Sequence, residues 1–318
     1  MPIVKLRKWF PDLGERDSTS GCRKDKPRWA VVLHPQFSAI CLPILLLWIG
    51  SLSCAAVGQL NLLSTQDEVE IGRQAAREVE QSMPMYKNPV VVAYIDSLGQ
   101  ALVKHSRRSN IRYSFKVVDT DQVNAFALPG GWLYVNRGLI LASEDESELA
   151  GVIGHEIGHV VGRHGARQIS KQYGLAVLVG LVAGSSEGGS SIARDIAGQF
   201  ASLGAGLTLL KYGRDAEREA DSFAVEELHA AGIDPDGMAT FFEKLLAMHE
   251  KNQGETATLF STHPPTAERI SNVRAQIQQL ADKRGLKSDS GRFQQIKVML
   301  KPAATDSTKQ RTRRRRGQ

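Results

Sequence analysis

The stretch His155-Glu156-Ile157-Gly158-His159 places two histidines four residues apart. In a helix, side chains at this spacing lie on one face, about 40° apart around the axis. Both imidazoles can then reach one Zn²⁺ at roughly 2.0–2.1 Å. Glu156 lies about 100° round the same turn, where it can act as a general base beside the metal without being a ligand. The alternative is a buried helix that carries two structural histidines.

Glycines follow one side of this predicted helix, which we place at residues 146–165. On a helical wheel they share a sector at roughly 260–340°, between the histidines and a continuous apolar arc at roughly 120–240°. Each glycine in a helix interior costs about 0.5–1 kcal/mol relative to alanine, so the stripe predicts close approach of another backbone. The alternative is a flexible helix. The stripe comprises Gly151, Gly154, Gly158, Gly162 and Gly165.

A second helix, beginning near Tyr212, carries a pair of carboxylates. Glu217 and Asp221 are four residues apart and therefore share a face. Small residues, among them Ala216 and Ala220, lie beside this pair. We hypothesise that the two small-residue stripes pack together and bring Glu217 to the metal. A solvated, charged helix is the alternative interpretation.

The chain has 318 residues and a net charge of +6. The basic residues are concentrated at the two ends, since residues 1–30 carry +4 and residues 301–318 carry +6, which leaves −4 for the rest. This distribution excludes a nucleic-acid-binding domain as the explanation of the charge. All three cysteines, Cys22, Cys41 and Cys54, precede residue 55. The region with the histidines therefore has neither a disulfide framework nor a cysteine-ligated zinc site.

The N-terminal region is typical of export to a membrane or beyond it. A basic extension, 1–36, precedes an uncharged apolar segment, 37–58, which predicts a signal sequence or membrane anchor. Ser51-Leu-Ser-Cys54 resembles a bacterial lipoprotein cleavage box, although Ser51 stands where leucine is usual. Three outcomes stay open: cleavage with lipidation of Cys54, simple cleavage, or a retained anchor.

Hydrophobic patterns predict an α+β, mainly helical domain with a small sheet over residues 64–283. Further helices are expected over 64–82, 90–105, 232–249 and 266–281, and a strand over 111–118. Two apolar runs flank Pro129-Gly130-Gly131 and predict a strand, a turn and a strand. The first of these strands contains Asn124, Ala125, Phe126 and Ala127. It could bind an extended peptide by strand addition or belong to an ordinary core hairpin. Residues 284–318 are expected to be a polar, basic, disordered tail.

Four motifs in one order resemble the membrane-associated zinc metallopeptidases that include HtpX, the CAAX prenyl protease and the periplasmic BepA- and LoiP-like peptidases. The first is Asn124-Ala-Phe-Ala with Pro-Gly-Gly, and the second is His155-Glu-Ile-Gly-His159. The third is Arg214-Asp-Ala-Glu-Arg-Glu-Ala-Asp221, and the fourth is Thr262-His-Pro-Pro. The resemblance covers roughly residues 64–280 and implies a zincin-like (gluzincin) fold.

The resemblance also implies the roles of the site residues. It makes His155, His159 and Glu217 the ligands of one Zn²⁺ per chain and Glu156 the base. It places Asp221 behind the ligands, where it orients His155 by a hydrogen bond. Glu219 is a rival ligand by composition, but it lies about 200° from Glu217 around the helix, and the family pattern selects Glu217.

Two further histidines need an interpretation. His263 matches a family histidine near the active site, where it either donates to the oxyanion of the reaction or blocks the fourth position of zinc; a buried structural histidine is the alternative. In metzincins a third ligand follows at the sixth position after His159, which here is Gly165. His164 is one residue off and points about 140° away from His159, so we reject a three-histidine site.

These residues predict a zinc-dependent endopeptidase of the bacterial cell envelope. By resemblance, its polypeptide substrates are misfolded or membrane-associated envelope proteins, and the enzyme works on the periplasmic side, held by a lipid anchor or signal anchor or secreted there. The alternative is a zinc-containing chaperone or assembly factor whose protease site is latched or vestigial. The sequence predicts no oligomeric state.

Overall fold

The computed structural model describes residues 61–172, 211–251 and 262–300. They belong to the second of two compact units of the chain, Cys54–Gln318. The basic extension 1–36, the apolar segment 37–58 and Cys54 lie outside these ranges. Within the described ranges, no helix is both long and apolar enough to cross a membrane.

A three-stranded sheet is formed by β1 (Ser114–Val118), β2 (Ala125–Leu128) and β3 (Trp132–Asn136). The strand order is β1-β3-β2, with β1 parallel and β2 antiparallel to β3, so β2 lies at an edge. The turn between β2 and β3 contains Gly130 and Gly131 at φ 77° and 104°, which are left-handed conformations that side chains disfavour. The predicted strand–turn–strand unit is confirmed.

Helices make up most of the described chain, which confirms the predicted α+β, mainly helical fold. Ser64 begins α3 with a reciprocal capping box to Asp67, and Asp145 caps α6 by accepting from the backbone N–H of Glu148. The helices are α3 (Thr65–Ser82), α4 (Pro89–Val103), α5 (Arg137–Ala142), α6 (Glu146–Val161), α9 (Arg214–Ala230), α10 (Asp236–Lys251), α12 (Ala267–Gln278) and α13 (Gly291–Leu300).

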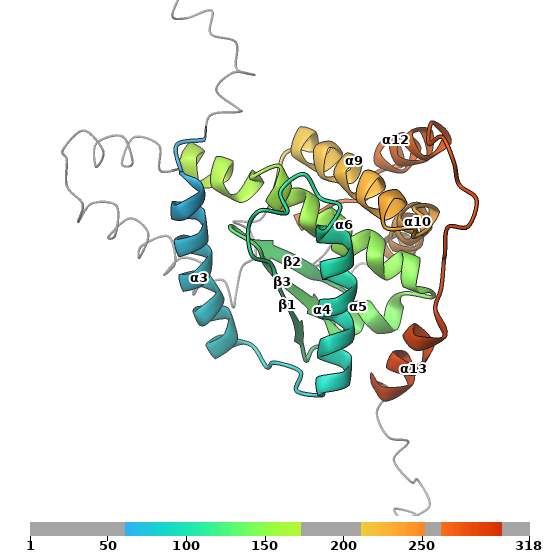
Figure 1. Cartoon of the computed structure of the whole chain (residues 1–318), viewed down its shortest axis with the longest axis horizontal. Helices are drawn as coiled ribbons and strands as arrows, with labels where there is room; N and C mark the ends of the chain where they lie inside the picture. Colours follow the sequence, from blue (N-terminus) through green and yellow to red (C-terminus); the bar gives the residue numbers. More distant parts are fainter. Residues whose placement is uncertain (1–60, 173–210, 252–261, 301–318) are drawn as a thin grey trace, which may run out of the picture. The chain divides into compact units, whose positions relative to one another are not determined.

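Helix α6 is the central element. It packs on β2 and β3 on one side and on α9 and α10 on another, and α12 contacts α9 and α10 in turn (Figure 1). Leu149, Ile153 and Ile157 are fully buried on its core side. This arrangement positions the face that carries the two histidines between the edge strand and α9.

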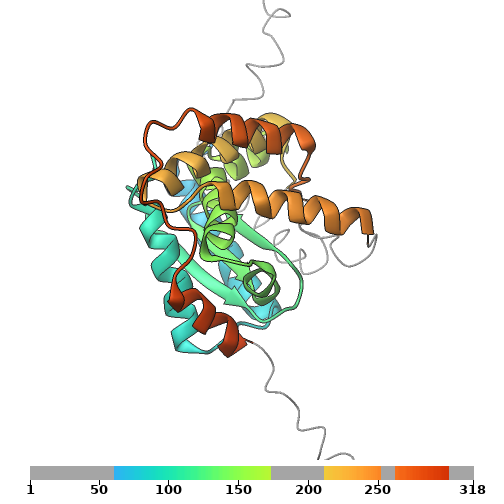
Figure 2. The same ribbon diagram turned by 90° about the vertical axis from the view of Figure 1, so that its right-hand side faces the viewer.

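The predicted ends of one helix and of the domain were wrong. Helix α6 ends at Val161, not at residue 165, because Gly162 is its C-cap and Arg163 takes a left-handed conformation (φ 55°) before a new helical segment starts at residue 164. The domain also continues beyond residue 283, since α13 packs against α4 and α5 (Figure 2). Only Phe293, Ile296 and Leu300 of α13 are buried, too few apolar residues to stand out in a polar stretch.

Candidate metal centre

Helix α6 brings both histidines of the motif to one point. The Nε2 atoms of His155 and His159 lie 3.0 Å apart, and both side chains are at most 3% exposed. Glu156, between them, is also buried (2% exposed). The sequence spacing thus produces the predicted convergence of two imidazoles with an adjacent carboxylate.

Close packing of α6 on α9 positions Glu217. A Cβ added to Gly158 would lie 2.6 Å from the backbone oxygen of Ala220, and one added to Gly154 would lie 3.3 Å from the Cβ of Ala224. These distances leave no room for larger side chains at the crossing. The hypothesis that two small-residue stripes let the helices approach is therefore confirmed for Gly154 and Gly158. The other three glycines of the stripe face other groups, Met238 of α10 for Gly151, His164 for Gly162 and Pro129 for Gly165.

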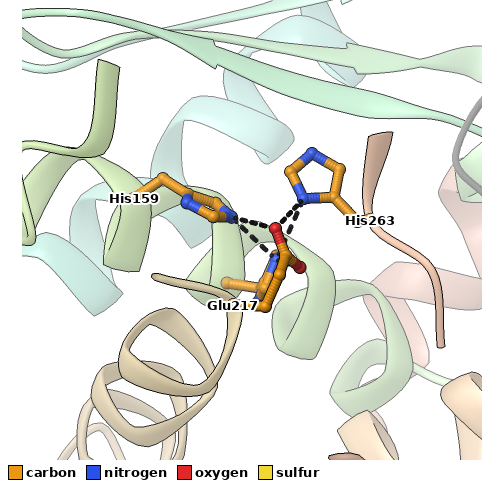
Figure 3. Close-up of side chains that lie close together, drawn as sticks. His159, Glu217 and His263 are labelled. Atoms are coloured by element: carbon orange, nitrogen blue, oxygen red, sulfur yellow. Dashed lines mark hydrogen bonds and ion pairs between the residues drawn. The ribbon is translucent and has the colours of Figure 1, made fainter. Parts of the chain in front are cut away.

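Four potential ligand atoms, from His155, His159, Glu217 and His263, lie within 4.8 Å of one another. His155 Nε2 is 3.3 Å from Glu217 Oε2 and 3.3 Å from His263 Nδ1. Glu217 Oε1 is 3.0 Å from His263 Nδ1 and 3.5 Å from His159 Nε2. Figure 3 shows the side chains of His159, Glu217 and His263 pointing toward one another. Ligands about 2.0–2.1 Å from a tetrahedral Zn²⁺ are roughly 3.3 Å apart, so the spacing and the donor types fit that ion.

Behind His155 lies a buried ion pair. Asp221 Oδ1 is 2.8 Å from His155 Nδ1, the position that the family resemblance implies for Asp221. Arg269 of α12 donates to both oxygens of Asp221 at 2.7 and 2.8 Å, and its Nη1 is 2.9 Å from Glu217 Oε2. The guanidinium also lies over the ring of Phe242, 4.7 Å from its centroid. One arginine thus holds two carboxylates of the site.

The electrostatics of the site follow from burial and these contacts. Burial opposes the charged form of His155, but Asp221 and Glu217 raise its pKa to about 9. Burial also opposes the carboxylate of Glu217, yet the charge of His263 and the hydrogen bond with His155 lower its pKa well below its usual range. Burial lowers the pKa of His159, which favours the neutral imidazole that a metal requires.

Glu156 faces the cluster without joining it. Its Oε1 is 3.6 Å from His263 Nε2 and has no hydrogen-bond partner among the described residues. Burial raises the pKa of Glu156, against the charges of His263 and His155, and a backbone hydrogen bond from Ala127 of β2 favours its ionised form. A buried carboxylate oxygen beside the ligands that makes no hydrogen bond within the described residues suits a group that exchanges a proton.

The predicted substrate strand lies beside Glu156. Asn124 precedes β2, and Ala125, Phe126 and Ala127 belong to it. All four residues are 5% exposed or less, and Asn124 Oδ1 has no hydrogen-bond partner in the described part of the chain. The structure thus places these residues at the site but with the edge covered.

Two side chains that support the site were not predicted from the sequence. Arg269 shares a helical face with the buried Ile270, Val273 and Ile277, and an arginine on an apolar face was the available signal. His164 Nδ1 lies 2.8 Å from His159 Nδ1, a contact that a continuous helix would not allow and that the break at Gly162 creates.

The rival ligand Glu219 lies away from the cluster. Its Oε2 is 3.1 Å from His164 Nε2 and accepts from Arg167 at 2.9 Å. The ring of Tyr212 stacks on His159, with centroids 4.3 Å apart. Neither His164 nor Glu219 belongs to the four-residue cluster, in agreement with their rejection as ligands.

A small sheet with an edge strand above a His-Glu-x-x-His helix, completed by a glutamate from a second helix, defines a zincin-like metallopeptidase. The chain belongs to peptidase family M48, whose family model matches residues 89–277. The resemblance seen in the four motifs is therefore confirmed.

Curated relatives agree with this family. The chain is 32% identical over 228 residues to the beta-barrel assembly-enhancing protease of Escherichia coli K12, which covers 69% of the chain and 46% of that protein. It is 31% identical to metalloprotease LoiP of the same organism (71% and 86% covered), and 29% identical to the mitochondrial metalloendopeptidase OMA1 of Schizosaccharomyces pombe (71% and 66%). The chain spans about half the length of the first of these. Their names confirm the predicted enzyme class, metallopeptidase, at the level of the family.

Proposed function

We propose that this chain is a zinc-dependent endopeptidase that hydrolyses peptide bonds in misfolded or membrane-associated proteins of the cell envelope. The observation that carries the proposal is the set of four buried ligand atoms within 4.8 Å, at separations of a tetrahedral zinc site. His155, His159 and Glu217 hold one zinc ion. When bound, the ion supplies Lewis-acid polarisation of the substrate carbonyl and activation of the attacking water.

Glu156 is the general base and acid of this mechanism. Its free Oε1 accepts a proton from the attacking water and returns it to the leaving amine. Burial raises the pKa of Glu156, which suits a group that holds a proton during the reaction, and the charges of His263 and His155 act against this rise. Asp221 and Arg269 keep the imidazole of His155 in one orientation through the Nδ1 contact.

His263 has two roles left open by the sequence, and its Nδ1 position favours the blocking role. That atom lies 3.0 Å from Glu217 Oε1 and 3.3 Å from His155 Nε2, which suits a fourth ligand. In this state the chain is latched, and His263 must leave before a substrate carbonyl can approach. The other role, donation to the oxyanion of the reaction, would require His263 to leave this position first.

The edge of β2 is the proposed substrate platform. An extended peptide that pairs with Asn124–Ala127 would pass beside Glu156, because the backbone of Ala127 already contacts that carboxylate. Since these residues are at most 5% exposed, the edge must be uncovered before a peptide binds. A covered edge and a blocked metal position are both features of a resting enzyme.

The location is proposed from the N-terminal sequence and from the names of relatives. The apolar segment 37–58 with Cys54 suits a signal sequence, lipidated or not, or an anchor. One relative is named for beta-barrel assembly. We place the enzyme on the periplasmic side of a bacterial envelope, associated with its membrane. A latched chaperone or assembly factor is the second candidate, favoured by the position of His263 alone.

The test compares zinc content and casein cleavage of the full chain with those of Glu156→Gln and Glu217→Gln. We expect one zinc and cleavage for the wild type, zinc without cleavage for Glu156→Gln, and loss of both for Glu217→Gln. Glu243→Gln, on an exposed face of α10, is the matched control and keeps both. A cleaving Glu156→Gln variant would refute the mechanism. If the wild type binds zinc but does not cleave, His263→Ala must gain activity, or the chaperone candidate replaces the peptidase.

A further inference from the structure

His159 has a support of its own behind the metal-facing side of its ring. Its Nδ1 lies 2.8 Å from Nδ1 of His164, and Nε2 of His164 lies 3.1 Å from Oε2 of Glu219. Arg167 donates to the same oxygen at 2.9 Å. His164 is 2% exposed, whereas the side chain of Glu219 is 38% exposed. A buried imidazole therefore links His159 to a carboxylate at the surface.

The direction of these hydrogen bonds follows from the chemistry of a neutral imidazole. A ring that presents the lone pair of Nε2 to a metal carries its proton on Nδ1. His159 must then donate from Nδ1, and His164 must accept at its own Nδ1. The proton of His164 is left on Nε2, which donates to Glu219. In this arrangement each N–H of His159 and His164 faces an acceptor, and each ring nitrogen with a lone pair faces a donor or the metal.

The backbone conformation at Gly162 and Arg163 places His164 next to His159. Gly162 caps α6 with φ −70°, a conformation open to any residue. However, a Cβ on Gly162 would lie 2.4 Å from Nε2 of His164. Arg163 follows in a left-handed conformation, held by an ion pair with Glu68 and by donation to the backbone oxygen of Leu63. The glycine leaves space for the imidazole, and the turn brings it back under His159.

We propose that His164 and Glu219 are positioning residues that fix the tautomer and orientation of His159 for zinc. This inference rests on the proposed role of His159 as a ligand. Outer groups of this kind raise metal affinity by roughly 10–100-fold. His164 thus supports the metal although it is not a ligand, and Glu219 completes the series from α9, the helix that also supplies Glu217.

The experiment measures the zinc dissociation constant of the full chain by competition with a chelator at fixed pH. Visible spectra of the cobalt-substituted protein report the ligand geometry. His164→Leu removes the acceptor, Gly162→Ala displaces the imidazole without removing a polar group, and His164→Asn keeps a hydrogen-bonding group near the position of Nδ1. His105→Leu, at an exposed histidine after α4, is the matched control.

We expect His164→Leu and Gly162→Ala to weaken zinc binding by roughly 10–100-fold and to alter the cobalt spectrum. His164→Asn should recover most of the affinity, and His105→Leu should leave it unchanged. If His164→Leu does not fold, Gly162→Ala and Glu219→Ala carry the test, since Glu219 is partly exposed. Wild-type affinity and spectrum in these variants, while His159→Ala loses zinc, would overturn the positioning role alone. Retention of zinc by His159→Ala would overturn the ligand assignment as well.

Discussion

The two histidines of α6 are one helical turn apart, yet the protein supports them in different ways. His155 contacts the carboxylate of Asp221 directly, and Arg269 pairs with that carboxylate. All three side chains are at most 6% exposed. The Nδ1 atom of His159 contacts a second imidazole, that of His164, and the carboxylate beyond this imidazole is the partly exposed Glu219.

The difference shows two solutions to the energetics of a buried charge. The carboxylate behind Nδ1 of His155 is buried, and because unpaired buried charges are costly, a guanidinium is buried with it. The ring of His164 separates Nδ1 of His159 from Glu219, which places that carboxylate where water can solvate it. Loss of a residue should therefore be far more damaging on the His155 side than at the outer end of the His159 side.

Arg269→Leu should produce the largest effect. It leaves Asp221 and Glu217 without their cation in a buried site, and breaking a buried pair costs about 3–5 kcal/mol. We expect a loss of that order in the free energy of unfolding, measured with urea, and zinc content well below one per chain.

Arg274→Leu is the control for this variant. It lies on the same helix, and its side chain is 39% exposed and paired with Glu243. Exposed pairs contribute about 0–1 kcal/mol. If Arg269→Leu and Arg274→Leu lowered the free energy of unfolding equally, the buried pair behind His155 would contribute no more to stability than an exposed pair.

Glu227→Gln tests what burial does to a carboxylate of α9 that, unlike Asp221, has no arginine partner in the described part of the chain. Glu227 is 2% exposed, neither oxygen has a hydrogen-bond partner among the described residues, and burial raises its pKa to about 9. The folded state then holds a proton that the unfolded state, with an ordinary pKa near 4.5, releases. Wild-type stability should therefore fall by on the order of 1 kcal/mol per pH unit between about pH 5 and 9.

Urea unfolding of wild type and Glu227→Gln at pH 5, 6, 7 and 8 checks this prediction. Glutamine stays neutral at every pH. The free energy of unfolding of the variant should therefore rise relative to that of the wild type as the pH rises. Other titrating groups are common to both proteins and cancel in the difference. A difference that does not change with pH would mean that Glu227 is ionised in the fold despite its burial.

Arg167→Ala should produce the smallest effect. Its pair with Glu219 has side chains 28% and 38% exposed, and such pairs contribute about 0.2–1 kcal/mol. We expect the free energy of unfolding to change by less than about 1 kcal/mol and zinc affinity by less than about fivefold. Calorimetry and chelator competition measure the two quantities. A collapse like that of Arg269→Leu would contradict the contrast between the sides.

The sequence predicted the features that depend on short spacings. The motif at residues 155–159, the carboxylate pair Glu217 and Asp221, and the turn Pro129-Gly-Gly each lie within one helix or one hairpin, where backbone geometry fixes relative directions. Packing of α6 on α9 was also predictable, because the small residues Gly158 and Ala220 allow two helices to approach closely. These local rules gave the mainly helical α+β class and the two histidines of α6, whereas the choice of Glu217 over Glu219 and the nomination of His263 came from the family resemblance.

The remaining features depend on long-range packing. No spacing rule connects Arg269 with Asp221, which are 48 residues apart, or His164 with Glu219, which are 55 apart. The assumption that α6 continues to residue 165 pointed His164 away from the site, and one left-handed residue, Arg163, reversed that outcome. Likewise, the few apolar residues of α13 did not predict a packed helix, and only their contacts with α4 and α5 show that it belongs to the domain.

The separation of Arg269 from the motif has a consequence for biosynthesis. A nascent chain that has reached the end of α9 already holds His155, His159, Glu217 and Asp221, but it lacks the guanidinium that neutralises two of these carboxylates. Arg269 follows 48 residues after Asp221 and 114 after His155. The contacts of Arg269 with Asp221 and His155 can therefore form only after α12 has been synthesised.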